Sequence, residues 1–134
     1  RPGKAITFGL LGGKPYLGLS GNPAAAYVGF EMLARPAIRK MRGFAEGTRP
    51  VQQATLTHGV KKRQHRRFFD RATVLRDPET GELLVTEAKT QNSALLGTMQ
   101  RANCLLRIDE GPCELKAGDA VDVVRVDLPE GAVL

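Results

Sequence analysis

Apolar positions in the first third of the chain form two short runs followed by one helical stripe. The runs at residues 5–11 and 14–19 are separated by two glycines, which predicts a β-hairpin. Apolar residues then recur at helical spacing and predict an amphipathic helix. Its stripe consists of Tyr27, Phe30, Leu33, Ala37, Ile38 and Met41.

The ends of this helix are well marked. Asn22 is a favourable N-cap, and Pro23 suits the first helical position because its missing N–H costs nothing there. Basic residues near the C-terminal end complement the helix dipole, and Gly43 can close the helix in a left-handed conformation. Pro36 is expected to kink the last turns.

The pattern changes after a breaker-rich stretch at residues 46–50, which we interpret as a linker between a first domain, residues 1–45, and a second, residues 51–134. Five strand-like runs follow at spacings typical of a small barrel or sandwich, with a turn at 77–81 that closes a hairpin. The runs are 51–57, 68–76, 82–88, 103–109 and 120–128. A short helix is expected at 94–101, capped by Ser93. The predicted fold class is α+β, a β-hairpin and helix followed by a small β-barrel-like domain.

Composition narrows the class of protein. The 134 residues are 42% apolar and 25% charged, as in ordinary globular domains, and no run is long enough to cross a membrane. Two cysteines without metal-ligand spacing indicate neither a zinc site nor a disulfide framework, so we expect a cytoplasmic protein with a buried Cys104. The chain starts without Met or a leader, so we expect a fragment. Its net charge of +6 favours anionic partners without identifying them.

The turn from the second run into the helix is the first candidate site. Ser20, Gly21, Asn22 and Pro23 place free N–H groups at the positive end of the helix dipole, where phosphate or carboxylate binds. Arg1 and Lys4 could add charge for an oxyanion. Such a turn also occurs in any α/β unit, and exposed basic residues near a terminus are often merely solvated, so a structural role stays open for both.

The second domain offers weaker candidates. The basic run 61–67, which includes His65, could bind a phosphate backbone, but no nucleic-acid-binding signature accompanies it, so we interpret it as a solvated loop and expect no nucleic-acid partner. Arg71 and Ser93 could offer charge-assisted and hydroxyl contacts. No serine sits in a nucleophile elbow, so we assign no catalytic and no metal residue in this chain.

Together these motifs resemble the C-terminal part of the molybdopterin molybdenumtransferase family, which includes bacterial MoeA proteins and the gephyrin E domain. Family members show Lys-Pro-Gly-Lys-Pro, where this chain has residues 1–5, and Leu-Pro-Gly-Asn-Pro-Val-Ser-Ala, where it has residues 19–26. Arg-Pro-Ala stands at 35–37, Arg-x-x-aromatic-x-Arg at 66–71, a Gln-Gly-Ser-like motif at 91–93, and further agreement at 101–103 and 117–119.

The resemblance implies that the first domain is the C-terminal piece of a three-layer α/β molybdopterin-binding domain. It further implies a homodimeric enzyme that inserts molybdate into adenylylated molybdopterin, releases AMP and uses Mg²⁺. By position, Arg1 and Lys4 would neutralise phosphate or molybdate, the residues from Gly21 to Pro23 would shape the binding loop, and Arg71 and Ser93 would line the cleft. Charge compensation and positioning suit such a transfer better than a strong base does.

The chain also departs from the family pattern. Ser20 replaces proline, Ala25 serine, Asn92 glycine, and Arg1 the first lysine. The family's Gly-Gly-x-Ser-x-Gly-x-x-Asp motif is missing, so we expect no turnover and no bound cofactor in this chain alone. The alternative is a non-catalytic module of the same family that binds a pterin or a partner protein, as a sensor or scaffold.

Overall fold

The structure is a computed structural model that describes residues 6–19, 21–88 and 101–129. By their internal contacts, these residues form two compact units, one up to residue 48 and one from residue 49 onward. The predicted helix at 94–101 lies outside the described residues except for Arg101, which is helical. In the described ranges no helix is long and apolar enough to cross a membrane.

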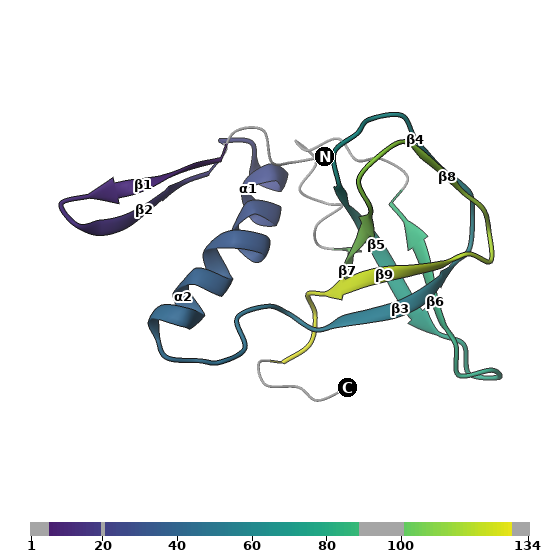
Figure 1. The fold of residues 1–134 in the computed structure, drawn as a ribbon. Helices are drawn as coiled ribbons and strands as arrows, with labels where there is room; N and C mark the ends of the chain where they lie inside the picture. The colour runs from purple at the N-terminus through teal and green to yellow at the C-terminus, as the bar shows by residue number, and fades with distance from the viewer. Residues whose placement is uncertain (1–5, 20, 89–100, 130–134) are drawn as a thin grey trace. The chain divides into compact units, whose positions relative to one another are not determined.

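The first unit begins with the predicted hairpin. Strands β1 (Thr7–Leu11) and β2 (Lys14–Gly18) pair antiparallel, with Thr7 opposite Gly18 (Figure 1). The turn needs Gly12 and Gly13, whose φ angles of 58° and 77° are left-handed. Apolar side chains on the hairpin are largely exposed, for example Phe8 at 74%.

The predicted helix is present but contains a π turn. It consists of α1 (Pro23–Gly29), the π-helical η1 (Phe30–Ala34) and α2 (Arg35–Met41). The N–H of Arg35 bonds to the carbonyl of Phe30, five residues back, directly before Pro36. The helix thus widens ahead of the proline ring, which would otherwise crowd the carbonyl four residues before it. Gly43 follows the helix with φ 88°, as expected for the closing position.

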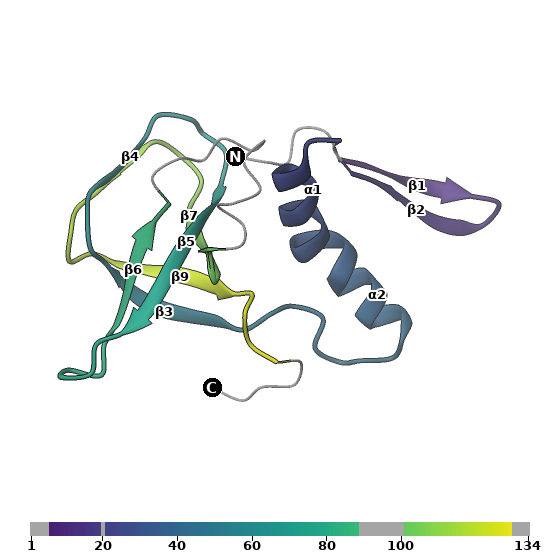
Figure 2. The same cartoon turned by 180° about the vertical axis from the view of Figure 1, so that it is seen from behind.

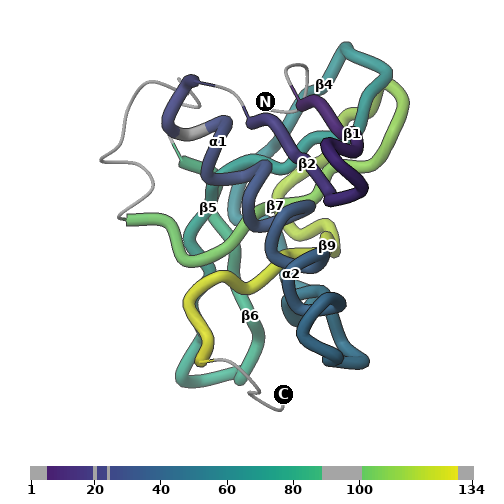
Figure 3. The backbone as a smooth tube through the Cα atoms, turned by 90° about the vertical axis from the view of Figure 1, so that its left-hand side faces the viewer, coloured from purple at the N-terminus to yellow at the C-terminus, as the bar shows by residue number. Residues whose placement is uncertain are grey.

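The second unit is a closed barrel in the order β3-β6-β5-β7-β9 (Figures 1 and 2). All five predicted strands are present; β5 has the predicted bounds, and the other four are one to three residues shorter. They are β3 (Val51–Leu56), β5 (Phe68–Arg76), β6 (Leu83–Glu87), β7 (Cys104–Ile108) and β9 (Ala120–Arg125). Strand β5 lies between β6 and β7 in this order. Figure 3 shows the backbone from the side. Four pairings are antiparallel, and the barrel closes where β3 and β6 pair in parallel over two residue pairs.

A small ribbon of β4 (Val60–Lys62) and β8 (Cys113–Leu115) was not predicted. The interpretation of 61–67 as a solvated loop is therefore wrong for Lys62, which is only 2% exposed. Strand alternation places Lys62 on the buried side with Val60, and its ammonium donates to the carbonyls of Arg66, at 2.6 Å, and Asp109. The remaining cations of the run are exposed or half-buried.

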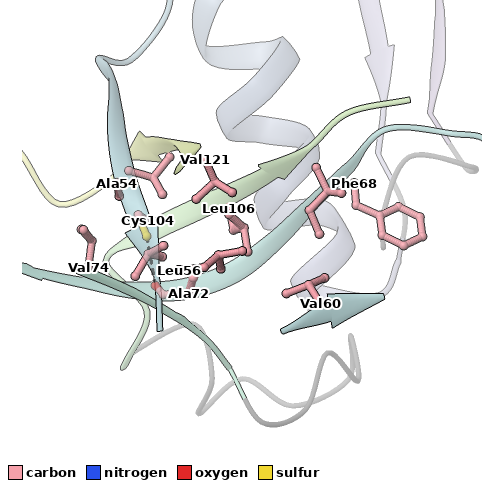
Figure 4. Packing of buried hydrophobic residues seen from close by; sticks show 12 residues of the cluster. Ala54, Leu56, Val60, Phe68, Ala72, Val74, Cys104, Leu106 and Val121 are labelled. Carbon is pink, nitrogen blue, oxygen red and sulfur yellow. Dashed lines mark hydrogen bonds between the residues drawn. The ribbon is translucent and has the colours of Figure 1, made fainter. Parts of the chain in front are cut away.

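Alternating side chains of the strands fill the barrel (Figure 4). On β5 the inward positions are Phe68, Asp70, Ala72 and Val74, all at 3% exposure or less. Cys104 is buried here as predicted, and burial raises the pKa of its thiol to about 12. It acts as a small hydrophobe whose thiol donates to the Ala72 carbonyl at 3.4 Å.

Candidate functional site

The turn before the helix, at Gly21, Asn22 and Pro23, is the candidate anion-binding loop, and helix capping occupies part of its backbone N–H groups. Asn22 is extended and accepts the N–H of Ala25 on its Oδ1 at 3.4 Å, which confirms it as the N-cap. Pro23 has no N–H. Among the first three helical residues, at most the N–H of Ala24 remains for an anion. Charge compensation for a phosphate at this turn would come from cations such as the predicted Arg1 and Lys4.

Three of the predicted anion-binding residues in the first unit, Arg1, Lys4 and Ser20, lie outside the described residues, as does Ser93 in the second. Their roles, and the pairing of Arg71 with Ser93, stay predictions. Gly21, Asn22 and Pro23 are described and stand at the turn from β2 into α1, as the sequence indicates.

Among the predicted anion-binding residues, Arg71 is the cation that the structure describes. It lies in the middle of β5 and is 3% exposed. Its register partner is Leu105 on β7, which in turn pairs with Val124 on β9; these are 0% and 5% exposed. None of the three belongs to the core cluster inside the barrel, so this row lies on the outer face of the sheet. A guanidinium therefore sits in a buried row beside aliphatic side chains.

The electrostatics of Arg71 follow from this position. Burial lowers the pKa of Arg71 from its ordinary value, because the charged form loses hydration, while the negative charge of neighbouring Asp70 acts in the opposite direction. Arginine stays protonated even so. A charge held in a dry setting interacts more strongly with an oxyanion than a solvated one does, since less water screens it.

Asp70 was missed by the sequence analysis. It is 0% exposed and points inward beside the apolar positions of β5, since it shares their strand face. The signal was available, because strict alternation places residue 70 on the same face as residues 68, 72 and 74. A carboxylate at such a position is costly unless it is bonded, so it marks a place where polar contacts were selected over packing.

A cavity of about 240 Å³ opens beside β7, β9 and the β4–β8 ribbon. Its lining carries Arg107 against Asp109, Glu110 and Asp122. The Arg107 guanidinium is paired with Asp122, and its Nε lies 3.6 Å from Asp109. The lining is net negative, with its cation already engaged, so this cavity does not suit a phosphate or molybdate.

The comparisons with known proteins fit the second unit directly. Residues 53–126, which include all of the barrel strands except the first two residues of β3, match the family model for the MoeA C-terminal region (domain IV). The chain belongs to the MoeA family. It is 35% identical over 127 residues to molybdopterin molybdenumtransferase 1 of Mycobacterium tuberculosis, a match that covers 91% of this chain and 30% of that protein. It is 32% identical over 124 residues to the molybdopterin molybdenumtransferase of Staphylococcus aureus, covering 92% of this chain and 29% of that protein.

Solved structures agree with this membership. The crystal structure of a molybdopterin biosynthesis MoeA protein from Pyrococcus horikoshii is similar to this chain, with a TM-score of 0.71 and 26% identity; the match covers 93% of this chain and 29% of the Pyrococcus chain. A molybdenum cofactor biosynthesis protein from Pyrococcus furiosus, at 23% identity and a TM-score of 0.68, shows the same fold. The chain thus spans about 30% of the length of the curated relatives it matches. The resemblance stated from the sequence motifs is confirmed.

Proposed function

We propose that this chain serves an enzyme that inserts molybdate into adenylylated molybdopterin and releases AMP. The names of the curated relatives support the reaction class, and the buried Arg71 is the observation in this chain that supports it best. Adenylylated molybdopterin and molybdate are both anionic, so a desolvated guanidinium on the barrel is the kind of group that such substrates need.

The role we assign to the chain is positioning and charge compensation. Arg71 would hold a phosphate or the oxyanion through charge-assisted hydrogen bonds, with Ser93 adding a hydroxyl contact. Arg1 and Lys4 would neutralise charge near the loop of Gly21, Asn22 and Pro23. Bringing two anions together in water costs free energy because they repel each other, and cations in fixed positions lower that cost.

We further propose that the chain alone has no turnover, and that the complete enzyme is a cytoplasmic homodimer that uses Mg²⁺. Among the described residues no group of three or more His, Cys, Asp or Glu side chains is placed to hold a metal ion. We assign no step of this chain to a metal.

The proposal is tested with a chimera in which this chain replaces the region it matches in the Staphylococcus aureus relative. Cofactor formation is measured in cells that lack their own enzyme. We expect Arg71→Ala to lower cofactor formation by roughly tenfold or more, and Arg71→Lys to restore only part of it, because lysine lacks the planar fork of donors.

The matched control is Arg76→Ala, on the same strand, whose exposed side chain donates to the Gly81 carbonyl at 2.6 Å. It should leave cofactor formation unchanged. If Arg71→Ala performs as well as this control, the assigned role of Arg71 is wrong. Pterin binding by the chimera without any metal insertion would instead favour the non-catalytic module.

A further inference from the structure

The parallel seam of the barrel is extended by side chains beyond its two backbone pairs. The Thr55 hydroxyl donates to Glu82 at 2.6 Å, and the hydroxyls of Thr57 and Thr86 lie 2.7 Å apart. The Thr57 N–H also bonds to the Val85 carbonyl at 3.1 Å. Residues 55–57 are thus held to residues 82–86 largely by hydrogen bonds of polar side chains, since the backbone pairing of β3 with β6 is short.

His58 makes the last contact of this seam, and its geometry defines its protonation state. The ring Nδ1 lies 2.9 Å from the Gly59 carbonyl, which can only accept, so Nδ1 carries a proton. The ring Nε2 lies 2.8 Å from the backbone nitrogen of Glu87, whose N–H can only donate, so Nε2 must present a lone pair. Both contacts hold together only in the neutral Nδ1–H tautomer.

The backbone that His58 holds leads directly to Arg71. Glu87 is the last residue of β6 and pairs with Ala72. The next N–H, that of Ala88, donates to the Arg71 carbonyl at 2.9 Å. The imidazole acceptor therefore helps to hold the end of β6, and the next N–H along the chain bonds to the backbone of Arg71, although His58 lies in the loop between β3 and β4 and Arg71 on β5.

We propose that His58 is a positioning residue for Arg71 that acts only while its ring is neutral, releasing the end of β6 when Nε2 is protonated. A proton on Nε2 would point at the Glu87 N–H, so the contact must break. The consequence for function rests on the role proposed above for Arg71, whereas the release itself does not.

The elements next to the His58 contacts carry charged side chains on or directly beside β4, β6 and β8. The ionisable side chains on these elements are Lys61, Lys62, Glu82, Glu87, Glu114 and Lys116. The variant Glu87→Gln removes the carboxylate of the residue whose N–H is held while keeping that N–H.

The release is measured on the 134-residue chain by amide hydrogen exchange, corrected for the intrinsic pH dependence of exchange. The protection factor of Glu87 should fall roughly five- to tenfold between about pH 7.5 and about pH 5, the equivalent of one hydrogen bond. In His58→Gln, whose amide oxygen accepts at any pH, protection should be independent of pH. In His58→Ala it should be low throughout. His65→Gln, which changes the chain's other histidine, should behave as wild type.

The link to Arg71 has its own measurement. The Nε–H resonance of Arg71 should shift with the same midpoint as the ring of His58 in the wild type and in Glu87→Gln, and should stay still in His58→Gln. An Arg71 signal that ignores the titration of His58 would overturn the proposal, as would equal protection of Glu87 at both pH values.

In the chimera, the KM for adenylylated molybdopterin should rise at acid pH in the wild type and stay flat in His58→Gln. A pH-independent KM in the wild type would contradict the effect on binding. Should Arg71→Ala leave cofactor formation intact while the exchange data hold, the proposed function fails and the release of β6 stands.

Discussion

The Asn103 side chain takes the place of a backbone partner for β5 just before β7 begins, and removing this side chain should open the barrel locally. Strand β7 begins at Cys104, so the inward Val74 of β5 has no backbone partner on that side. The Asn103 amide supplies one: its Oδ1 accepts the Val74 N–H at 2.8 Å, and its Nδ2 donates to the Val74 carbonyl at 2.9 Å. Asn103→Ala removes both bonds and leaves two part-buried backbone groups unsatisfied.

The expected cost follows from those two groups. Each buried backbone group that loses its partner costs about 1–3 kcal/mol, and water entering at the strand end recovers a part, so the free energy of unfolding should fall by about 2–4 kcal/mol. Asn103→Asp keeps the acceptor but sets a carboxylate against the Val74 carbonyl, so it should destabilise more at neutral pH than near pH 4, where the acid is protonated.

Urea denaturation followed by circular dichroism gives the change in stability, and amide exchange at Val74 localises it. Gln64→Ala, an exposed amide side chain in the 63–67 loop, is the control and should lie within about 0.5 kcal/mol of wild type. An Asn103→Ala variant as stable as this control, or one with an unchanged Val74 exchange rate, would refute the reasoning.

Three further outcomes are expected from the second unit. At about pH 8 a maleimide should label half-buried Cys113 while Cys104 stays unlabelled by mass spectrometry, because burial raises the pKa of Cys104 to about 12. Hydrogen bonds from Arg125 lower the pKa of Asp127. The stabilisation that this carboxylate contributes should therefore be present above about pH 4 and be lost as pH falls through its folded pKa. Asp127→Asn should abolish this pH dependence when the free energy of unfolding is measured across an acid titration. Leu106→Ala, at a site with 0% exposure, should cost about 2–5 kcal/mol in urea denaturation.

Much of this fold was predictable because local patterns and burial agree. Strand-like runs at spacings typical of a small barrel identified all five barrel strands, and Asn22, Pro23 and Gly43 marked the helix ends correctly. The strands β4 and β8 escaped because they are three residues long and carry charges, and strand pairing across fifty residues leaves no local signal. The burial of Lys62 depends on two carbonyls, and only that of Arg66 is close in sequence; the other belongs to Asp109, which no short sequence window around Lys62 contains.

The candidate site was less accessible to sequence reasoning. The basic character of Arg71 was visible, but its burial follows from its place in the sheet, and the alternation that reveals Asp70 was not applied to it. His58 was assigned no role from the sequence, because one of its two observed contacts is the backbone N–H of Glu87, 29 residues away. Arg1, Lys4, Ser20 and Ser93 lie outside the described residues, so their placement stays a prediction.

The order of strands in the barrel has a consequence for biosynthesis. Strand β3 leaves the ribosome first among the barrel strands, yet its antiparallel partner is β9. The pairing of Val51 with Val124 can therefore form only after β9 has been synthesised. Until then the nascent chain carries an open apolar edge, and closure is a long-range step that follows the synthesis of almost the whole unit. A ribosome stalled before residue 120 would hold a chain that cannot close its barrel, so a nascent chain of this length should recruit chaperones that the finished one does not.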